Sequence, residues 1–342
     1  MQTGYNRVIK RIPRWKSVNF EYGGFTMQNQ GKHAAPRRTR RGGRGMVVAA
    51  VLLCVLVLLT VAAAKLRSGA GGAGTPDGAG AGASASADEV GALLTRLGAS
   101  ITDGMYVGEC GEDYAAQLRA LAAEEPDRAG QLNFIADHID IYTEDYVKTA
   151  LLGGDHIDFA LELPFRTPDS SGLDAQVGSG NGAIPYLSQY DERWGYHAYG
   201  SSVIGIAGCG PTCLAMAVAG LKGDSSCNPA KVADFASANG YYMAGTGTMW
   251  SLFTEGAAAY GLTGEEIPLD ENVMNSCLGS GAVIVASMLP GDFTQSGHFI
   301  VIYGLGDGGY RVHDPNSAGR SAQTWTYERL SGQIANLWSL SA

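Results

Sequence analysis

The C-terminal part of the chain, residues 183–342, predicts an α+β fold because helical patterns come first and strand-like runs follow them. Apolar residues at helical spacing predict helices over residues 210–220, 229–240, 248–260 and 271–278. The second of these helices has Asn228 as its N-cap and Pro229 in its first turn. Runs of β-branched and aromatic residues predict strands at 282–288, 298–303, 310–313 and 323–326, after an extended opening segment at 184–188.

A smaller region before this domain, residues 89–166, is predicted to be helical. Aliphatic side chains recur there at helical spacing, and two similar units of aliphatic and aromatic residues follow at 132–142 and 157–164. His138 and His156 stand beside acidic residues in this region, which is a composition that metal sites share. We interpret both histidines as side chains on solvated helix faces, so the region predicts architecture and no chemistry.

Charge is unevenly distributed along the chain. The 342 residues carry a formal net charge of −9, yet residues 1–45 hold 11 Lys and Arg against the single acid Glu21. Residues 46–64 then form an apolar run without a charge, proline or glycine, which spans about 29 Å as a helix. Because basic residues flank a membrane span on its cytoplasmic side, we predict a transmembrane helix at 46–64, a cytoplasmic tail at 1–45 and an extracellular remainder.

Two alternatives stay open for the N-terminal segments. The small residues at 62–64 resemble a signal-peptide cleavage site, although the leader and the apolar run are both long for that role. The basic leader also has the charge of a nucleic-acid-binding segment. Its place beside the apolar run instead favours a role in setting the membrane topology and in contacting anionic lipid. Residues 65–88 and 167–182, which are rich in glycine, alanine and serine or other turn-forming residues, are predicted to be linkers.

Cysteine is the residue type that points to chemistry. Of the six cysteines, Cys54 lies in the predicted membrane span and five follow it, and their spacing has neither a CxxC pair nor a histidine pattern suited to zinc. An exported protein can form disulfides, but five cysteines leave at least one thiol without an intramolecular partner. We therefore expect no metal and no cofactor, and examine the cysteines as nucleophiles.

Cys209 stands between two glycines, directly before the helix predicted at 210–220. The glycines allow a tight turn and a close approach of substrate. The positive end of the helix dipole and the unpaired N–H groups of the first turn favour a thiolate there, and they can hold a developing oxyanion. Cys213, one turn further along, is interpreted as a small buried residue. On this pattern alone, Cys209 fits a structural cysteine as well as a nucleophile.

A histidine and an acid lie where they can serve such a cysteine. His298 opens a strongly apolar strand, and Asp314 ends the strand that follows it in sequence, so we expect the two strands to be neighbours. Strand alternation points His313 and Asp314 to opposite faces, and we favour Asp314 as the partner of His298. An acid in that place fixes the tautomer of the imidazole. A cysteine on a helix with histidine and aspartate on neighbouring strands is suited to nucleophilic acyl transfer.

Four motifs in this order resemble the C39-like group of papain-fold cysteine peptidases. They are IPYLSQYDERWG (Ile184–Gly195), GCGPTCLAMAVAGL (Gly208–Leu221), GHFIVIYG (Gly297–Gly304) and HDPN (His313–Asn316). The resemblance implies a papain-like fold in which a helical part carries the cysteine and an antiparallel sheet follows. It implies that Cys209 is the nucleophile, His298 the general base and then acid, Asp314 the orienting acid and Gln189 an oxyanion-hole donor.

Two departures from the family pattern bear on these roles. Gln189 lies 20 residues before Cys209, whereas papain-like enzymes usually place this glutamine closer to the nucleophile. Cys213 stands where a small hydroxyl residue is expected, which adds a second thiol near the first and leaves the triad intact.

The sequence as a whole predicts a membrane-anchored, extracellular bacterial cysteine peptidase that hydrolyses a peptide or amide bond of a peptide or protein through a thioester acyl-enzyme. Two alternatives are an amidase or transpeptidase that acts on cell-wall peptides with the same nucleophile, and a catalytically silent surface-binding module. The presence of cysteine, histidine and aspartate together argues against the silent module. No GxxxxGK[ST] signature is present, which excludes a complete ATP-driven exporter with a peptidase domain. We expect a monomer that binds no nucleic acid.

Overall fold

The computed structural model describes residues 86–168, 171–178 and 183–342. The predicted tail at 1–45 and the predicted transmembrane helix at 46–64 lie outside these residues, as does the linker predicted at 65–88 except for its last three residues, which cap and begin a helix. Within the described ranges, no helix has the length and apolar character needed to cross a membrane.

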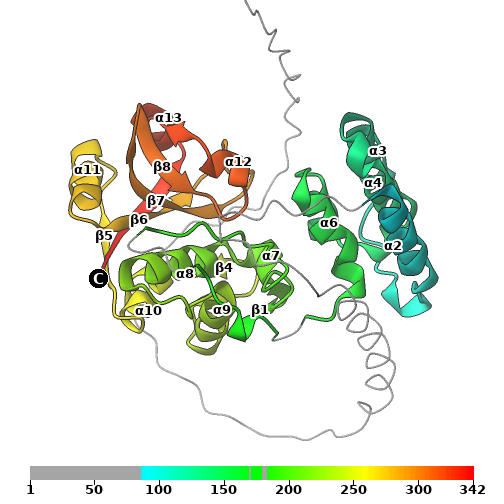
Figure 1. The fold of residues 1–342 in the computed structure, drawn as a ribbon, viewed down its shortest axis with the longest axis horizontal. Coiled ribbons are helices and arrows are strands. Elements are labelled where there is room, and N and C mark those ends of the chain that lie inside the picture. Colours follow the sequence, from blue (N-terminus) through cyan, green and yellow to red (C-terminus); the bar gives the residue numbers. More distant parts are fainter. Residues whose placement is uncertain (1–85, 169–170, 179–182) are drawn as a thin grey trace, which may run out of the picture. The chain divides into compact units, whose positions relative to one another are not determined.

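Five α-helices with short 3-10 turns make up the helical region that precedes the α+β part (Figure 1). The helices are α2 (Ala87–Ala99), α3 (Glu112–Glu124), α4 (Ala129–Asp137), α5 (Glu144–Ala150) and α6 (Asp155–Glu162), and the turns are η1 (Asp103–Met105), η2 (Pro126–Arg128), η3 (Ile139–Ile141) and η4 (Leu163–Phe165). Ser86 and Glu89 form a capping box at the start of α2, which satisfies backbone N–H groups that the first turn leaves free. The helices bury their aliphatic and aromatic faces in one shared core that includes Leu118, Leu132 and Ile157.

The interpretation of His156 as a solvated side chain is wrong. This residue, in the first turn of α6, is only 9% exposed. Its ring lies 4.2 Å from the ring of Tyr190, and one ring nitrogen faces Asn316, both of which belong to the α+β part. Because these partners come from distant positions in the sequence, the helical pattern around His156 gave no sign of them. His138 is half-buried and packs on Phe134.

A six-stranded antiparallel sheet forms the centre of the α+β part, with strand order β5-β10-β6-β7-β8-β9. Its strands are β5 (Thr263–Ile267), β6 (Val283–Met288), β7 (His298–Gly306), β8 (Gly309–His313), β9 (Thr324–Trp325) and β10 (Ile334–Ser341). Four of them fall on the runs predicted as strands. β5 and β10 were not predicted, and β10 pairs with both β5 and β6, so it lies inside the sheet.

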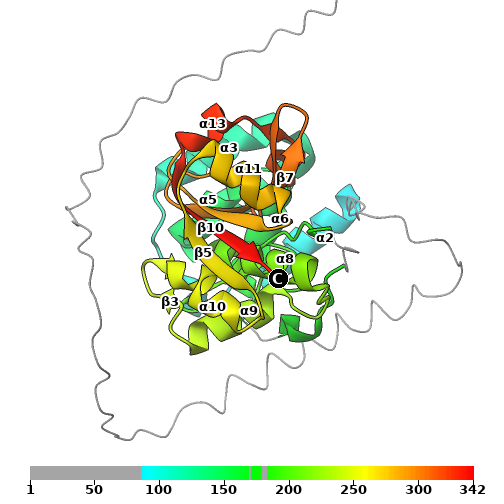
Figure 2. The ribbon, with the colours of Figure 1, turned by 90° about the vertical axis from the view of Figure 1, so that its left-hand side faces the viewer.

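The two faces of the sheet contact different helices. Val283, Val285 and Val301 share a core with the buried face of α8 (Cys209–Lys222), whereas the alternate residues Ile284 and Ile300 share another with Met274 of α11 (Glu271–Gly279). Figure 2 shows α8, α9 (Pro229–Ala238) and α10 (Glu255–Ala258) on one side of β5 and β10, and α11 on the other. Burial on both faces explains why β6 and β7 are continuously apolar.

The remaining elements are short. The helix predicted at 248–260 is divided into η6 (Trp250–Phe253) and α10, because Thr254 has ψ −81° and interrupts the helical backbone. Two small hairpins, three short helices and a 3-10 turn complete the described part: β1 (Ala198–Tyr199) with β2 (Ser202–Val203), β3 (Tyr242–Met243) with β4 (Gly247–Thr248), α7 (Ile204–Ala207), α12 (Ala318–Ser321), α13 (Tyr327–Ser331) and η5 (Ser171–Asp174).

Part of the linker predicted at 167–182 packs against the domain. The Asn228 side-chain nitrogen lies within hydrogen-bonding distance of the carbonyl oxygens of Gly172 (3.0 Å) and Ala175 (2.7 Å), while its side-chain oxygen caps α9. Val177 is buried in the core that contains α8. Asn228 therefore serves as the predicted helix cap and also as an anchor for this segment.

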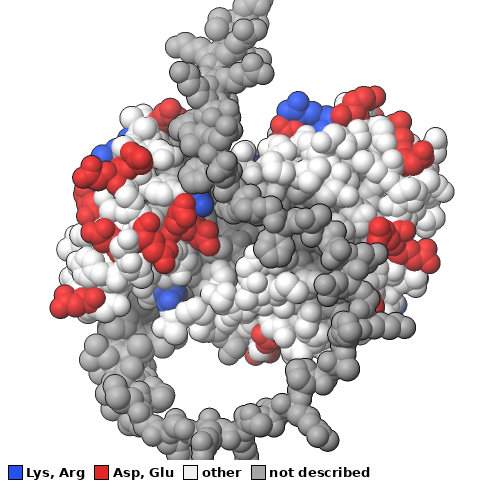
Figure 3. Space-filling view, turned by 180° about the vertical axis from the view of Figure 1, so that it is seen from behind, with Lys and Arg blue, Asp and Glu red and all other residues white. Residues whose placement is uncertain are grey.

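Acidic side chains greatly outnumber basic ones on the face of the molecule seen in Figure 3. Residues 86–166 alone hold 16 Asp and Glu against 5 Lys and Arg. The surface of the described part therefore carries the negative charge that the sequence places after the basic leader.

Candidate functional site

Cys209 begins helix α8, and its side chain is half-buried. The glycines on either side are required by close packing: a Cβ on Gly208 would lie 2.6 Å from the carbonyl oxygen of Ile204, and one on Gly210 would lie 2.6 Å from the side chain of Thr248. The first N–H groups of a helix have no intrahelical acceptor, and Pro211 has no N–H, so the donors at the start of this 14-residue helix are the backbone N–H groups of Cys209 and Gly210.

His298 and Asp314 meet at one end of the sheet. His298 is the first residue of β7, Asp314 follows the last residue of β8, and these two strands pair in antiparallel register. The imidazole Nε2 lies 2.6 Å from Oδ1 of Asp314. Both side chains are buried, and Asp314 is completely inaccessible to solvent. The second nitrogen of the ring, Nδ1, is thus the one that remains for a partner on the other side.

Cys209 lies near this imidazole, close enough for its sulfur to influence the pKa of His298. Burial alone would lower the pKa of His298, but the Asp314 carboxylate and the Cys209 sulfur outweigh it and raise that pKa to about 10. This raised pKa favours a protonated imidazole at neutral pH, beside the Asp314 carboxylate. Cys209 at the start of α8, His298 at the start of β7 and Asp314 after the end of β8 are thus close to one another in the structure.

Three groups that sequence analysis did not single out hold Asp314 in place. The Arg320 guanidinium, on α12, forms an ion pair with Oδ2, and the backbone N–H of Asn316 donates to Oδ1 over 2.8 Å. The hydroxyl of Ser321 accepts from the backbone N–H of Asp314. The sequence contains a turn-forming Asp-Pro-Asn segment and an arginine six residues after the aspartate, which is the only local sign of these contacts. It could not reveal that α12 folds back so that Arg320 reaches the Asp314 carboxylate.

Gln189 is also buried, and its contacts differ from those of the other candidates. Its side-chain Nε2 donates to the carbonyl oxygen of Gly205 over 2.9 Å, and its Oε1 has no partner within the described residues. Its backbone N–H donates to the carbonyl oxygen of Pro315, next to Asp314. The structure thus joins Gln189 to α7, the short helix before α8, and to the loop after β8, and no direct bond to Cys209 or His298 is found among the described residues.

The other histidines of the α+β part have different partners. His313 bonds through Nε2 to the carbonyl oxygen of Ile184 over 3.0 Å and stacks on Tyr303, with ring centroids 4.0 Å apart. Burial lowers the pKa of His313. His197 pairs with Asp234. Asp314, and not His313, is accordingly the residue placed beside His298, as the alternation of the strand predicted.

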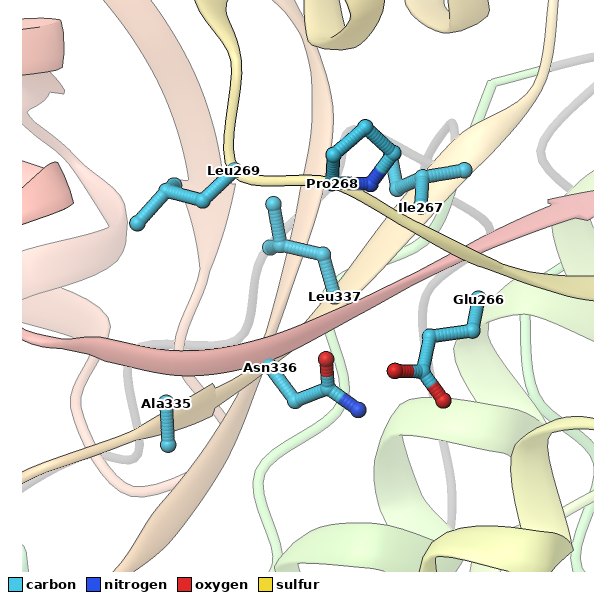
Figure 4. A pocket seen from close by; sticks show the side chains of 7 residues that line it. All are labelled: Glu266, Ile267, Pro268, Leu269, Ala335, Asn336 and Leu337. Atoms are coloured by element: carbon cyan, nitrogen blue, oxygen red, sulfur yellow. The ribbon is translucent and has the colours of Figure 1, made fainter.

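Within the described ranges, no group of three or more histidine, cysteine or acidic side chains is arranged to hold a metal ion. A cavity of about 370 Å³ lies elsewhere, where the end of β5 meets β10, and Figure 4 shows its lining. It is lined by Glu266, Ile267, Pro268, Leu269, Ala335, Asn336 and Leu337. None of these residues belongs to the candidate site, so the cavity is separate from it.

An α+β domain with a cysteine at a helix N-terminus, near a histidine that is bonded to a buried aspartate, has the arrangement of a thiol-dependent acyl-transfer site. The comparison with known families agrees with this class: residues 182–341 match the Peptidase_C39 like family. This part of the chain belongs to that family of peptidases.

A solved structure of a candidate C39-like peptidase from Bacillus anthracis is also similar to the chain. The two are 14% identical, the match covers 47% of this chain and 96% of that one, and the TM-score is 0.30. None of the curated proteins is significantly similar to this chain.

Proposed function

We propose that this protein is a cysteine peptidase of papain-like fold in which Cys209 is the nucleophile, His298 the general base and acid, and Asp314 the orienting acid. The observation that carries the proposal is the 2.6 Å contact of the His298 imidazole with the buried Asp314 carboxylate, with Cys209 near enough to raise the pKa of the same imidazole. Membership of a peptidase family supports a peptide as the substrate. The α8 helix packed against an antiparallel sheet supports the fold assignment.

The proposed reaction begins with the Cys209 thiolate, which the neighbouring imidazolium stabilises. The sulfur attacks the carbonyl carbon of the substrate, and the first N–H groups of α8 hold the resulting oxyanion, with the Gln189 amide as a further donor. The C–N bond then breaks as His298 gives its proton to the leaving amine. Water, deprotonated by His298, attacks the thioester and releases the acid, and the proton returns the imidazole to its starting state.

Replacement of Cys209 by alanine tests the nucleophile. We expect Cys209→Ala to abolish hydrolysis of a fluorogenic peptide library, because the variant lacks the nucleophile. The thermal unfolding midpoint is expected to change little, because the Cys209 side chain is only half-buried and lies at the first position of α8. The matched control is Cys213→Ala, one turn along the same helix, where the thiol is fully buried. This variant is expected to lose about 1 kcal/mol of stability and keep its activity. Loss of folding in Cys209→Ala, or retained hydrolysis, would remove Cys209 from the mechanism.

We also propose that the chain is anchored by residues 46–64 with the peptidase outside the cell membrane. The support is the apolar run and its basic N-terminal flank. Protease added to intact cells is then expected to remove the C-terminal domain, whereas a cytoplasmic control protein stays intact. Release of the native domain into the medium without protease would favour signal cleavage, and full protection from protease would place the domain inside.

A further inference from the structure

Helix α6 of the helical region carries a buried histidine that faces the loop after β8. The Nε2 atom of His156 lies 3.0 Å from the backbone oxygen of Asn316 and 3.1 Å from its side-chain oxygen, and Nδ1 lies 3.1 Å from the carbonyl oxygen of Gly153. Each ring nitrogen thus faces a backbone carbonyl oxygen, and the ring donates through the nitrogen that carries the hydrogen. A surface that served packing alone would be better made of apolar side chains, because a buried polar ring is costly unless it is bonded.

The contact leads directly to the candidate site. The backbone N–H of Asn316, the residue bonded by His156, donates over 2.8 Å to Oδ1 of Asp314. The same oxygen lies 2.6 Å from Nε2 of His298. Three hydrogen bonds, through Asn316 and Asp314, therefore connect His156 to the imidazole of His298, although 142 positions separate the two histidines in the sequence.

A second contact from the same helix reaches Gln189. The Phe159 ring packs so closely on Gly205 that a Cβ there would lie 2.1 Å from it, and the carbonyl oxygen of Gly205 accepts from the side chain of Gln189. The backbone N–H of Gln189 in turn donates to Pro315, which lies between Asp314 and Asn316. One helix of eight residues therefore holds both loops that support the site.

We propose that His156 is a positioning residue of the active site, and that the helical region holds the Asp314 loop in its working geometry through α6. This inference rests on the proposed function, since it assigns His156 a role only through Asp314 and His298. If His156 has this role, residues 86–166 are needed for the full reactivity of Cys209.

The test uses the full chain and measures alkylation of Cys209 by iodoacetamide at pH 6 and at pH 10, resolved by residue with mass spectrometry. A cysteine without an activating environment is almost fully protonated at pH 6, so fast alkylation there reports activation by neighbouring groups, whereas at pH 10 ordinary thiols also react. His156→Phe keeps an aromatic ring against Tyr190 and removes both nitrogen atoms. We expect it to lower the rate at pH 6 by about 10- to 100-fold, with little change at pH 10.

Three further variants make the result specific. His156→Gln keeps an amide donor and is expected to recover part of the rate at pH 6. His156→Asn, whose amide is too short to reach Asn316, is a second removal variant in case the phenylalanine variant does not fold. His138→Phe is the matched control, because this half-buried histidine of the same region packs on Phe134 and has no bond to the α+β part among its described contacts.

The outcomes separate the inference from the function on which it rests. If His156→Phe and His156→Asn both keep the wild-type ratio of the Cys209 alkylation rate at pH 6 to that at pH 10, His156 has no positioning role. The proposed peptidase function would be unaffected by that result. If wild-type Cys209 reacts at pH 6 no faster than Cys277, which is also a half-buried thiol, the proposed function itself fails. An equal loss of rate at both pH values, together with a lowered unfolding midpoint, would make His156 a structural residue only.

Discussion

At the scale of single residues, Asp314 illustrates how a fully buried charge is kept. Burial opposes ionisation of this carboxyl, but its contacts with His298 and Arg320 outweigh that cost and hold its pKa below the ordinary value. The backbone N–H of Asn316 adds a further donor. Both carboxylate oxygens are therefore bonded, which fixes the direction in which the acid orients His298.

The same pair predicts how stability depends on pH. His298 has a pKa raised to about 10 in the folded protein from an ordinary value of 6.5, so its protonation favours the folded state. The stabilisation is fully present below pH 6.5 and is lost as the pH rises toward 10. Urea unfolding at pH 6 and pH 9.5 is expected to show a larger loss of stability for the wild type than for His298→Gln. Equal losses in the two proteins would contradict the raised pKa.

At the scale of elements, the start of α8 depends on close contact with the hairpin of β3 and β4. Gly210 has no space for a side chain, since a Cβ would lie 2.6 Å from Thr248, whose hydroxyl is bonded to Tyr199. We expect Gly210→Ala to lower the free energy of unfolding by about 1–3 kcal/mol, as measured by urea denaturation.

A second glycine in a helix provides the control for this prediction. Gly91 lies inside α2, is exposed to solvent, and would have no atom within 4 Å of an added Cβ. Gly91→Ala is expected to stabilise the protein by about 0.5–1 kcal/mol, because alanine is the better helix former. If Gly210→Ala and Gly91→Ala change the free energy of unfolding in the same direction, close packing at Gly210 is not what determines the effect of its substitution.

Some helices and strands could be predicted from the local sequence pattern alone. β6 and β7 are continuous apolar runs, and α9 has an asparagine cap followed by proline, so both kinds of element were predicted from short stretches. β5 could not be, because it contains Gly264 and two glutamates and lies at the edge of the sheet. β10 was missed although it pairs on both sides, since its partners β5 and β6 are distant in sequence.

At the scale of the whole molecule, the helical region and the α+β part share one core. All described residues belong to a single compact unit. Tyr196 and Val203 of the α+β part are buried in the same cluster as Leu118 and Ile135 of the helical region. Stacking of Phe159 on Tyr196, with ring centroids 4.6 Å apart, adds to this interface. The helical region is thus an integral part of the described structure.

The cysteines give a prediction for the molecule as a whole. The five cysteines in the described residues are all free thiols, and three of them are buried. Stability therefore comes from packing and hydrogen bonds, and a reducing agent is expected to leave the thermal unfolding midpoint unchanged. The measurement compares unfolding with and without dithiothreitol. A midpoint that falls by several degrees on reduction would indicate a disulfide instead.

The sequence by itself determined the α+β class, the central strands and the candidate residues Cys209, His298 and Asp314, because short motifs of cysteine, glycine and apolar residues record local geometry. Only the tertiary structure decided that Arg320 pairs with Asp314 and that His156 is buried against Asn316. Such contacts join segments far apart in the chain or depend on how a loop folds back. They are set by the packing of whole elements, and a local sequence pattern holds no record of that packing.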